Sequence, residues 1–128
     1  MSYYFSKTVS TPFDEAVTNV INGLKEQDFG ILTEIDVKKT LKKKLDADFR
    51  RYLILGACNP PFAYKALLVE DKVGTMLPCN VIVQEKTDGS VEIAAIDPVA
   101  SMQAIDNTEL QEIAETIAKK LRTVIEAS

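Results

Sequence analysis

The chain has 128 residues, of which 46% are hydrophobic and 27% charged, with a net charge of −4, two cysteines and no histidine. This composition fits one soluble globular domain over residues 1–128, with enough apolar residues for a core that needs no disulfide bonds. The lack of histidine excludes Ser-His-Asp and Cys-His catalysis and histidine zinc sites, and two cysteines alone make a poor zinc site, so no metal is expected.

The same features restrict the partners and the location that we expect. A net negative charge argues against a nucleic-acid-binding domain, since such domains usually carry a basic surface. The N-terminus lacks the basic and apolar regions of a signal peptide, and no apolar run approaches the length that crosses a bilayer. We therefore expect a cytoplasmic protein without a membrane partner, in which both cysteines are reduced.

The first elements read as a strand followed by a long helix. Residues Tyr3–Val9 alternate between apolar and polar side chains, which predicts a strand with one buried face, although Lys7 falls on the apolar side. Ser10-Thr11-Pro12 is a helix-start signal, and the apolar stripe over Phe13–Leu24 predicts a helix that ends near Gln27.

A second strand and a short lysine-rich helix are expected next. Gly30–Val37 reads as a strand, and Asp36 is placed to cap a helix that carries apolar residues as far as Phe49. The outer face of this helix holds five lysines within Lys38–Lys44. Because no aromatic residues or glycines are interleaved with them, we interpret the segment as a solvated face and not as a nucleic-acid site.

The second half of the chain predicts three further strands and two further helices. Strands are expected at Tyr52–Cys58, Cys79–Glu85 and Val91–Ile96, the last two joined by a hairpin turn at Asp88-Gly89. A short helix should run from Asn59 to about Leu68, and a last helix should carry the apolar stripe from Leu110 to Val124.

This order predicts a two-layer α+β domain with a mostly antiparallel five-stranded sheet. The two long helices each have one apolar face, which is enough to cover one face of the sheet, and the two short helices are insertions between strands. Strands such as Leu53–Leu55 and Val81–Val83 are apolar on both sides, which is typical of strands buried on both faces. Either the short helices cover the second face or a second subunit does, and we expect a homodimer.

Both cysteines lie in Cys-Asn turns that are separated by 20 residues. Cys58-Asn59-Pro60 ends a strand at a helix start, where the helix dipole would stabilise a thiolate, and Cys79-Asn80 begins the next strand. If these strands are antiparallel neighbours, the two turns meet at one edge of the sheet. The alternative is that both cysteines only pack as small apolar residues.

The segments Gly56-Ala57-Cys58-Asn59-Pro60 and Leu77-Pro78-Cys79-Asn80, followed by Asp97-Pro98 and Met102, resemble the prokaryotic family called domain of unknown function 302. The resemblance extends from the first strand to the last helix. It implies a fold like that of the TATA-box-binding-protein class, with the order β-α-β4-α, and it adds Asp97 to the candidate site. The family has no settled activity, so the resemblance leaves the function open.

We hypothesise a homodimeric binding or sensing module with a small-molecule site formed by Cys58, Asn59, Pro60, Cys79, Asn80 and Asp97. The alternative is a thiol-dependent redox protein or enzyme, in which Cys58 reacts and Cys79 resolves. Lys65 is then the nearest base in the sequence. A structural interaction module without a small-molecule site is the third hypothesis. The sequence identifies neither the ligand nor a cofactor, and it leaves open whether the protein is an enzyme.

Overall fold

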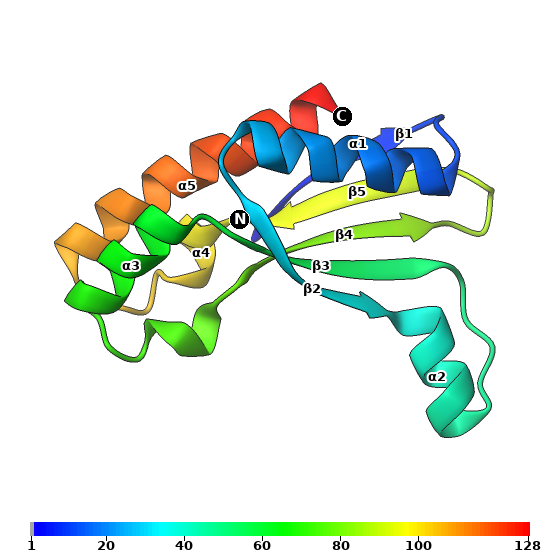
Figure 1. The fold of residues 1–128 in the computed structure, drawn as a ribbon, viewed down its shortest axis with the longest axis horizontal. Helices are drawn as coiled ribbons and strands as arrows, with labels where there is room; N and C mark the ends of the chain where they lie inside the picture. The colour runs from blue at the N-terminus through cyan, green and yellow to red at the C-terminus, as the bar shows by residue number, and fades with distance from the viewer. Residues whose placement is uncertain (1) are drawn as a thin grey trace.

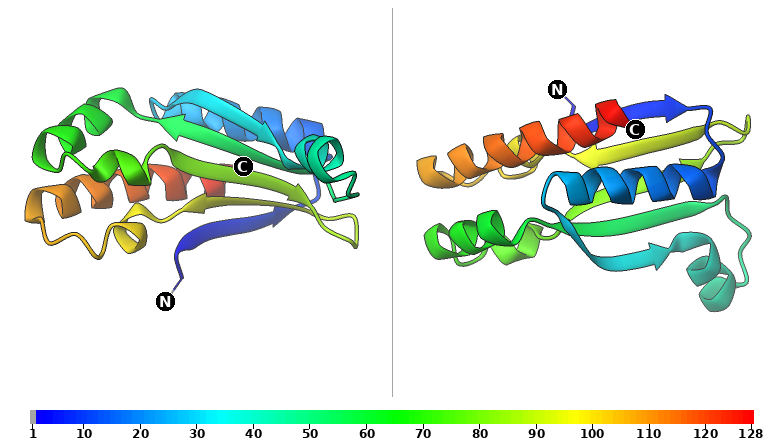
Figure 2. Two further views of the ribbon diagram at one scale, coloured as in Figure 1. Left: turned by 90° about the horizontal axis from the view of Figure 1, so that it is seen from below. Right: turned by 45° about the horizontal axis from the view of Figure 1, so that its top comes forward.

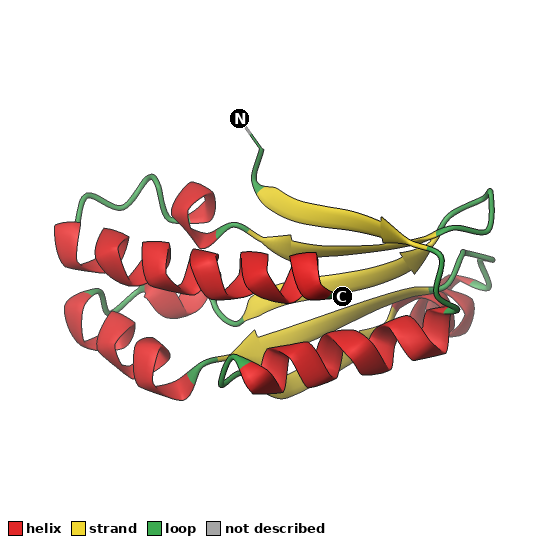
Figure 3. Ribbon diagram, turned by 90° about the horizontal axis from the view of Figure 1, so that it is seen from above, coloured by secondary structure: helices red, strands yellow, loops and turns green. Residues whose placement is uncertain are grey.

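A computed structural model describes residues 2–128 and consists of a five-stranded sheet with two long helices on one face (Figures 1 and 3). The strands are β1 (Tyr4–Val9), β2 (Gly30–Asp36), β3 (Tyr52–Cys58), β4 (Cys79–Glu85) and β5 (Val91–Ile96). The helices are α1 (Phe13–Glu26), α2 (Val37–Leu45), α3 (Pro60–Val69), α4 (Pro98–Ser101) and α5 (Thr108–Ala127), with a 3-10 turn, η1 (Val73–Met76). The predicted two-layer α+β class is confirmed.

The sheet order is β1-β5-β4-β3-β2, and every neighbouring pair of strands is antiparallel. The expected hairpin joins β4 to β5, with Gly89 at a φ of 86°. Glycine suits this position because a side chain is disfavoured in the left-handed region. In the centre of the sheet, β3 pairs with β4 so that Ala57 lies opposite Cys79. The end of β3 and the start of β4 therefore meet at the same end of the sheet.

The main core lies between the sheet and the two long helices. Buried side chains from both layers form it, among them Val20, Leu24, Leu55, Val81, Ile93 and Leu121. Removing such apolar side chains from water is worth about 25 cal/mol per Å² of surface.

Lys7, on the apolar side of β1, reaches past this core, and its Nζ donates to the backbone oxygens of Glu126 and Ser128 at 2.9 and 2.8 Å. Its ammonium group thus satisfies carbonyls at the end of α5.

Helix α5 is longer than the sheet that it covers. Its 20 residues span about 30 Å at the helical rise, whereas the seven residues of β4 span about 24 Å. Helix α5 is also displaced along the sheet, so that its N-terminal half extends beyond the strands, and α3 and α4 pack against it there (Figure 1). A second, smaller apolar cluster fills this region and consists of Ala66, Val73, Met102, Leu110 and Ala114.

Helix α2 lies at the opposite end of the sheet and is shorter than predicted. Asp36 caps it as expected, since its carboxylate accepts a hydrogen bond from the Lys39 backbone N–H at 3.0 Å. The expected extension to Phe49 is wrong, because the helix ends at Leu45 and Asp46 adopts the left-handed conformation with a φ of 51°. All nine residues of α2 retain some solvent exposure, so this helix adds little to either apolar cluster.

The second face of the sheet carries no helix within residues 2–128 (Figure 2). This observation excludes the alternative in which the short helices cover it. Strand alternation places Ile54, Ile82 and Ala94 on this face, next to Tyr4 and Tyr52. We call the surface formed by these five residues the open face.

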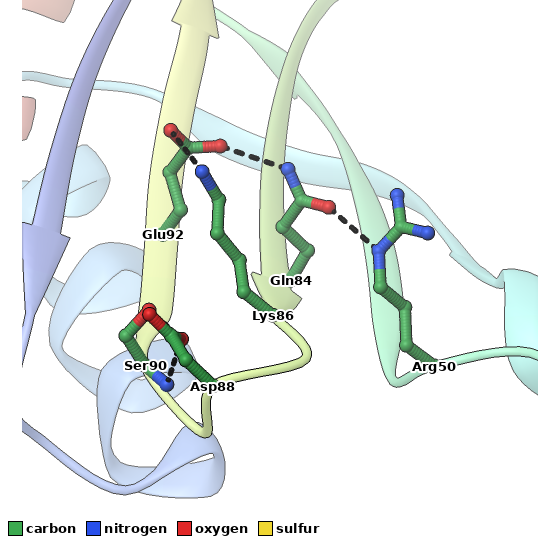
Figure 4. A network of polar contacts seen from close by, with 6 residues as sticks. All are labelled: Arg50, Gln84, Lys86, Asp88, Ser90 and Glu92. Carbon is green, nitrogen blue, oxygen red and sulfur yellow. Dashed lines mark hydrogen bonds and ion pairs between the residues drawn. The ribbon is translucent and has the colours of Figure 1, made fainter.

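The open face is polar at its hairpin end. There the Arg50 Nε donates to Gln84 Oε1 at 2.9 Å, and the Gln84 Nε2 donates to Glu92 Oε1 at 2.8 Å (Figure 4). Lys86 adds an ion pair with Glu92 at 3.4 Å. The open face is thus apolar in its centre and has a polar network at one end.

Candidate functional site

A cavity of about 320 Å³ lies at the end of the sheet where β3 stops and β4 begins. The sheet contributes Ala57, Cys58 and Cys79 to its wall. Helices α3 and α5 supply the largest part of the lining, with Phe62, Ala63, Ala66, Leu67, Leu110, Ile113, Ala114 and Ile117. Leu32 of the edge strand β2 also lines it, and loops and short helical turns complete it with Phe29, Asn59, Gly74, Leu77, Pro78, Pro98 and Met102.

Two features of the sequence produce this cavity. Pro60 follows β3 and, because it lacks an N–H, suits the first turn of a helix, so the chain leaves the sheet as α3 directly after Cys58. Helix α5 continues beyond the strands and closes the opposite wall. Small side chains then face the space between these elements, since Ala57, Ala63, Ala66 and Ala114 all line the cavity.

Both cysteines are free thiols that line the cavity in different surroundings. Cys79 is buried, with 8% of its surface exposed, and Cys58 is half-buried. Burial raises the pKa of the Cys79 thiol to about 11, and the neighbouring Cys58 acts in the same direction. Cys79 is therefore a neutral thiol at pH 7, and it is a weak nucleophile because the thiolate is the reactive form.

Asn59 lines the cavity and carries a buried acceptor without a partner. Its side chain is buried, with 5% exposed, and the Nδ2 donates to the Gln27 backbone oxygen at 3.3 Å. The Oδ1 has no hydrogen-bond partner among residues 2–128. Asn59 occupies the N-cap position of α3, as predicted, but the expected capping hydrogen bond is absent there. The amide is instead held by the turn that follows α1.

The other predicted site residues lie outside the cavity. Asn80 is exposed and points to the open face, because it follows Cys79 in β4 and successive strand residues alternate. Pro60 is exposed in the first turn of α3. The Asp97 carboxylate caps α4 by accepting from the Val99 N–H at 3.0 Å. The structure thus brings together Cys58, Asn59 and Cys79 and separates them from Asn80, Pro60 and Asp97.

Most of the cavity wall was not identified by sequence reasoning. Met102 was noted only for the resemblance, and Phe29 had no signal because it lies in a turn. The apolar stripe of α5 predicts packing against the sheet and does not by itself indicate a cavity. The stripe is longer than the strands, however, and this difference in length could have indicated that part of it lies beyond the sheet. Within residues 2–128, no group of three or more His, Cys, Asp or Glu residues is arranged to hold a metal ion. None of the helices described combines the length and apolar character that a membrane crossing requires.

Comparisons with known proteins agree with this architecture. A family model described as domain of unknown function DUF302 matches residues 5–128. The crystal structure of an uncharacterized conserved DUF302 protein from Bacillus stearothermophilus is similar over 99% of this chain and 98% of that chain, with 29% identity and a TM-score of 0.92. A search of curated proteins finds no match.

Proposed function

We propose, from the premise that this chain belongs to the DUF302 family, that it is a small binding or sensing module whose ligand occupies the cavity beside the two cysteines. One observation carries the proposal: an apolar cavity of about 320 Å³ lies between the end of the sheet, α3 and α5. This volume falls in the range of small-molecule sites. Such sites are typically lined by apolar side chains with a small number of polar groups.

Displacement of an apolar reporter dye tests the proposal. The Ala63→Leu variant adds side-chain volume in the lining while keeping a good helix former in α3. We expect the wild type to bind the dye and this variant to bind it at least tenfold more weakly. Ala104→Leu is the matched control, because Ala104 is exposed and lies outside the cavity wall. Equal dye binding by all three proteins would contradict the proposed site.

The same module is proposed to act as a homodimer. The open face supports this proposal, since its centre holds Ile54, Ile82 and Ala94 without a covering helix. Large exposed apolar surfaces on soluble proteins commonly mark interfaces. A two-fold pairing of this face leaves the cavity of each subunit free, because the cavity lies beyond the end of the sheet.

Thiol chemistry is the second candidate function. Two free thiols on one cavity wall favour it, because loss of two electrons and two protons to a disulfide oxidant such as oxidised glutathione would join them. The raised pKa of Cys79 disfavours it, and the cavity wall contains no lysine or carboxylate that could act as a base. Lys65 is outside this wall, with its Nζ 5.2 Å from the centre of the Phe62 ring. We therefore rank binding above redox chemistry.

A further inference from the structure

Helix α2 and the loop after it concentrate positive charge in one part of the molecule. Residues 36–51 contain seven lysines and arginines and three aspartates, which gives them a net charge of +4. Since the whole chain has a net charge of −4, the other residues together carry −8. None of the nine residues of α2 is buried, so packing does not explain this helix. A basic segment on an otherwise acidic protein attracts anions to one place.

The basic segment forms one wall of a groove of about 470 Å³. Lys38, Lys39 and Lys42 line the groove from α2, and Arg51 lines it from the residue before β3. The three lysines share one side of the helix, because residues three and four positions apart are neighbours on its surface. Helix α1 forms the opposite wall. Four cationic side chains thus surround one space.

The two carboxylates that line the groove already have partners. The Asp14 Oδ1 lies 2.6 Å from a terminal nitrogen of Arg51. The Asp36 Oδ1 accepts a hydrogen bond from the Lys39 backbone N–H at 3.0 Å, which leaves the ammonium group of this lysine free. The aspartates therefore neutralise Arg51 and cap α2, and neither is paired with a lysine ammonium group.

The three lysines of the groove differ in their partners. The Lys42 Nζ lies 2.8 Å from Asp46 and 3.4 Å from Asp48, and both carboxylates are exposed. Such exposed pairs contribute little, because water and salt screen them. Lys38 and Lys39 form no ion pair within residues 2–128. Two ammonium groups are thus unpaired at the groove, and a ligand with two negative charges would balance them.

Part of the groove wall is apolar. Phe13 and Val17 of α1 and Leu53 of β3 line it together with the cations. The guanidinium carbon of Arg51 lies 4.1 Å from the centre of the Phe13 ring, so a cation and an aromatic face meet in this wall. The volume of the groove corresponds to roughly fifteen water molecules. An anion that is joined to an organic group therefore fills it better than a free inorganic ion does.

We propose that this groove binds a small organic phosphate ester, whose phosphate is held by Lys38 and Lys39 and whose organic group packs against Phe13 and Val17. A phosphate monoester carries nearly two negative charges at pH 8, because its second pKa is about 6. It therefore matches the two unpaired ammonium groups, whereas a carboxylate or a sulfate ester brings only one charge. Helix α2 and the cavity beside the cysteines lie at opposite ends of the sheet (Figure 1). The inference thus goes beyond the proposed function and does not depend on it.

Isothermal titration calorimetry at pH 8 and low salt tests the inference with three matched probes. Phenyl phosphate is doubly charged, phenyl sulfate carries the same ring with one charge, and inorganic phosphate lacks the ring. We expect phenyl phosphate to bind most tightly and each of the other two to bind at least fivefold more weakly. Equal affinity of phenyl phosphate and either of the others would overturn the inference. Binding of random-sequence DNA or of phosphatidylserine vesicles without binding of phenyl phosphate would overturn it as well, and so would no binding at all.

Two double variants with the same change in net charge locate the site. Lys38→Gln with Lys39→Gln removes the unpaired cations of the groove and should weaken the binding of phenyl phosphate at least tenfold. Lys43→Gln with Lys44→Gln removes two charges of α2 that do not line the groove, and its affinity should stay within twofold of the wild type. All four side chains are exposed, so both variants should keep the fold. Equal weakening in the two variants would indicate general attraction to a positive helix and overturn the inference.

Discussion

At the scale of single residues, Cys58 and Cys79 share a cavity but not an environment. Cys79 starts β4 inside the main core, whereas Cys58 ends β3 with part of its surface exposed. Burial raises the pKa of Cys79 from 9.0 to about 11. The folded state therefore retains the Cys79 proton at pH values where the unfolded chain has lost it.

This difference predicts a pH dependence of stability. The contribution of Cys79 is complete below pH 9 and is lost as the pH rises through 11, because ionisation is easier in the unfolded chain. Between about pH 8 and about pH 10, the free energy of unfolding of the wild type should fall by about 1 kcal/mol relative to Cys79→Ala. Urea unfolding of both proteins measures this difference, and Cys58→Ala should retain most of the fall, because burial is the larger cause of the raised pKa of Cys79. A constant difference across this range would contradict the burial of the Cys79 thiol.

A close contact at Gly56 gives a second prediction. A Cβ atom at this position would overlap Thr33 Oγ1 and lie 2.9 Å from Pro78 Cγ, next to the start of the cavity wall. Gly56→Ala should therefore lower the free energy of unfolding by roughly 2 kcal/mol, as overpacking does. The control is Gly30→Ala in the paired strand, where no heavy atom lies within 4 Å of the added Cβ. Denaturant titration should show a larger loss of unfolding free energy for Gly56→Ala than for Gly30→Ala. Equal losses would exclude the steric explanation.

At the scale of elements, the start of α5 holds the cavity walls together. The Asn107 Oδ1 accepts from the Leu110 N–H at 3.1 Å, and its Nδ2 donates to the Val69 carbonyl at the end of α3 at 2.8 Å. One side chain thus caps α5 and ties it to α3. The helices on either side of the cavity depend on each other through this residue.

Asn107→Ala should therefore destabilise the protein more than a cap substitution alone. Loss of the cap and of the bond to Val69 together should cost about 2 kcal/mol. Asn22→Ala is the matched control, since Asn22 is exposed on α1, away from the open face, and it should not lower stability. Thermal unfolding followed by circular dichroism distinguishes the two variants. A melting temperature of Asn107→Ala equal to that of Asn22→Ala would contradict the role given to Asn107.

At the scale of the whole molecule, one face of the sheet is covered by helices and the other, the open face, is uncovered. Helices α1 and α5 cover one face, α2 lies beyond one end, and α3, η1 and α4 lie beyond the other (Figures 1 and 2). The cavity lies at one end and the open face lies on the uncovered side. Ligand binding and self-association can therefore be tested separately.

Light scattering at low micromolar concentration tests the assembly. We expect about twice the chain mass of 14.2 kDa, because the two-fold pairing buries the apolar centre of the open face. Ile82→Lys places a charge in that centre and should give a monomer with an unchanged circular dichroism spectrum. Leu45→Lys is the control, since Leu45 is 71% exposed on α2, away from the open face, and it should remain dimeric. A monomeric wild type would refute the dimer.

The sequence by itself determined the elements and their layering. The bounds of β3, β4 and β5 follow from runs of apolar residues that end at proline, asparagine or charged residues, and these signals are local. The stripes on α1 and α5 required one sheet face to cover, and the structure confirms that arrangement. The exception is α2, where apolar spacing continued to Phe49 but the helix stopped at Asp46. The spacing of apolar residues gives no information about the left-handed backbone conformation of Asp46 that ends this helix.

Only the tertiary structure decided which of the predicted site residues share a cavity. Asn59 and Asn80 each follow a cysteine in the sequence, yet one lines the cavity and the other lies on the open face. The reason is that Asn59 has left the sheet as the N-cap of α3, whereas Asn80 lies within β4, where alternation places it on the face opposite to the buried Cys79. The cavity wall also joins residues as distant in sequence as Phe29 and Ile117. Periodicity shows only which face of an element is apolar, and the overhang of α5 beyond the sheet makes part of that face a wall of the cavity.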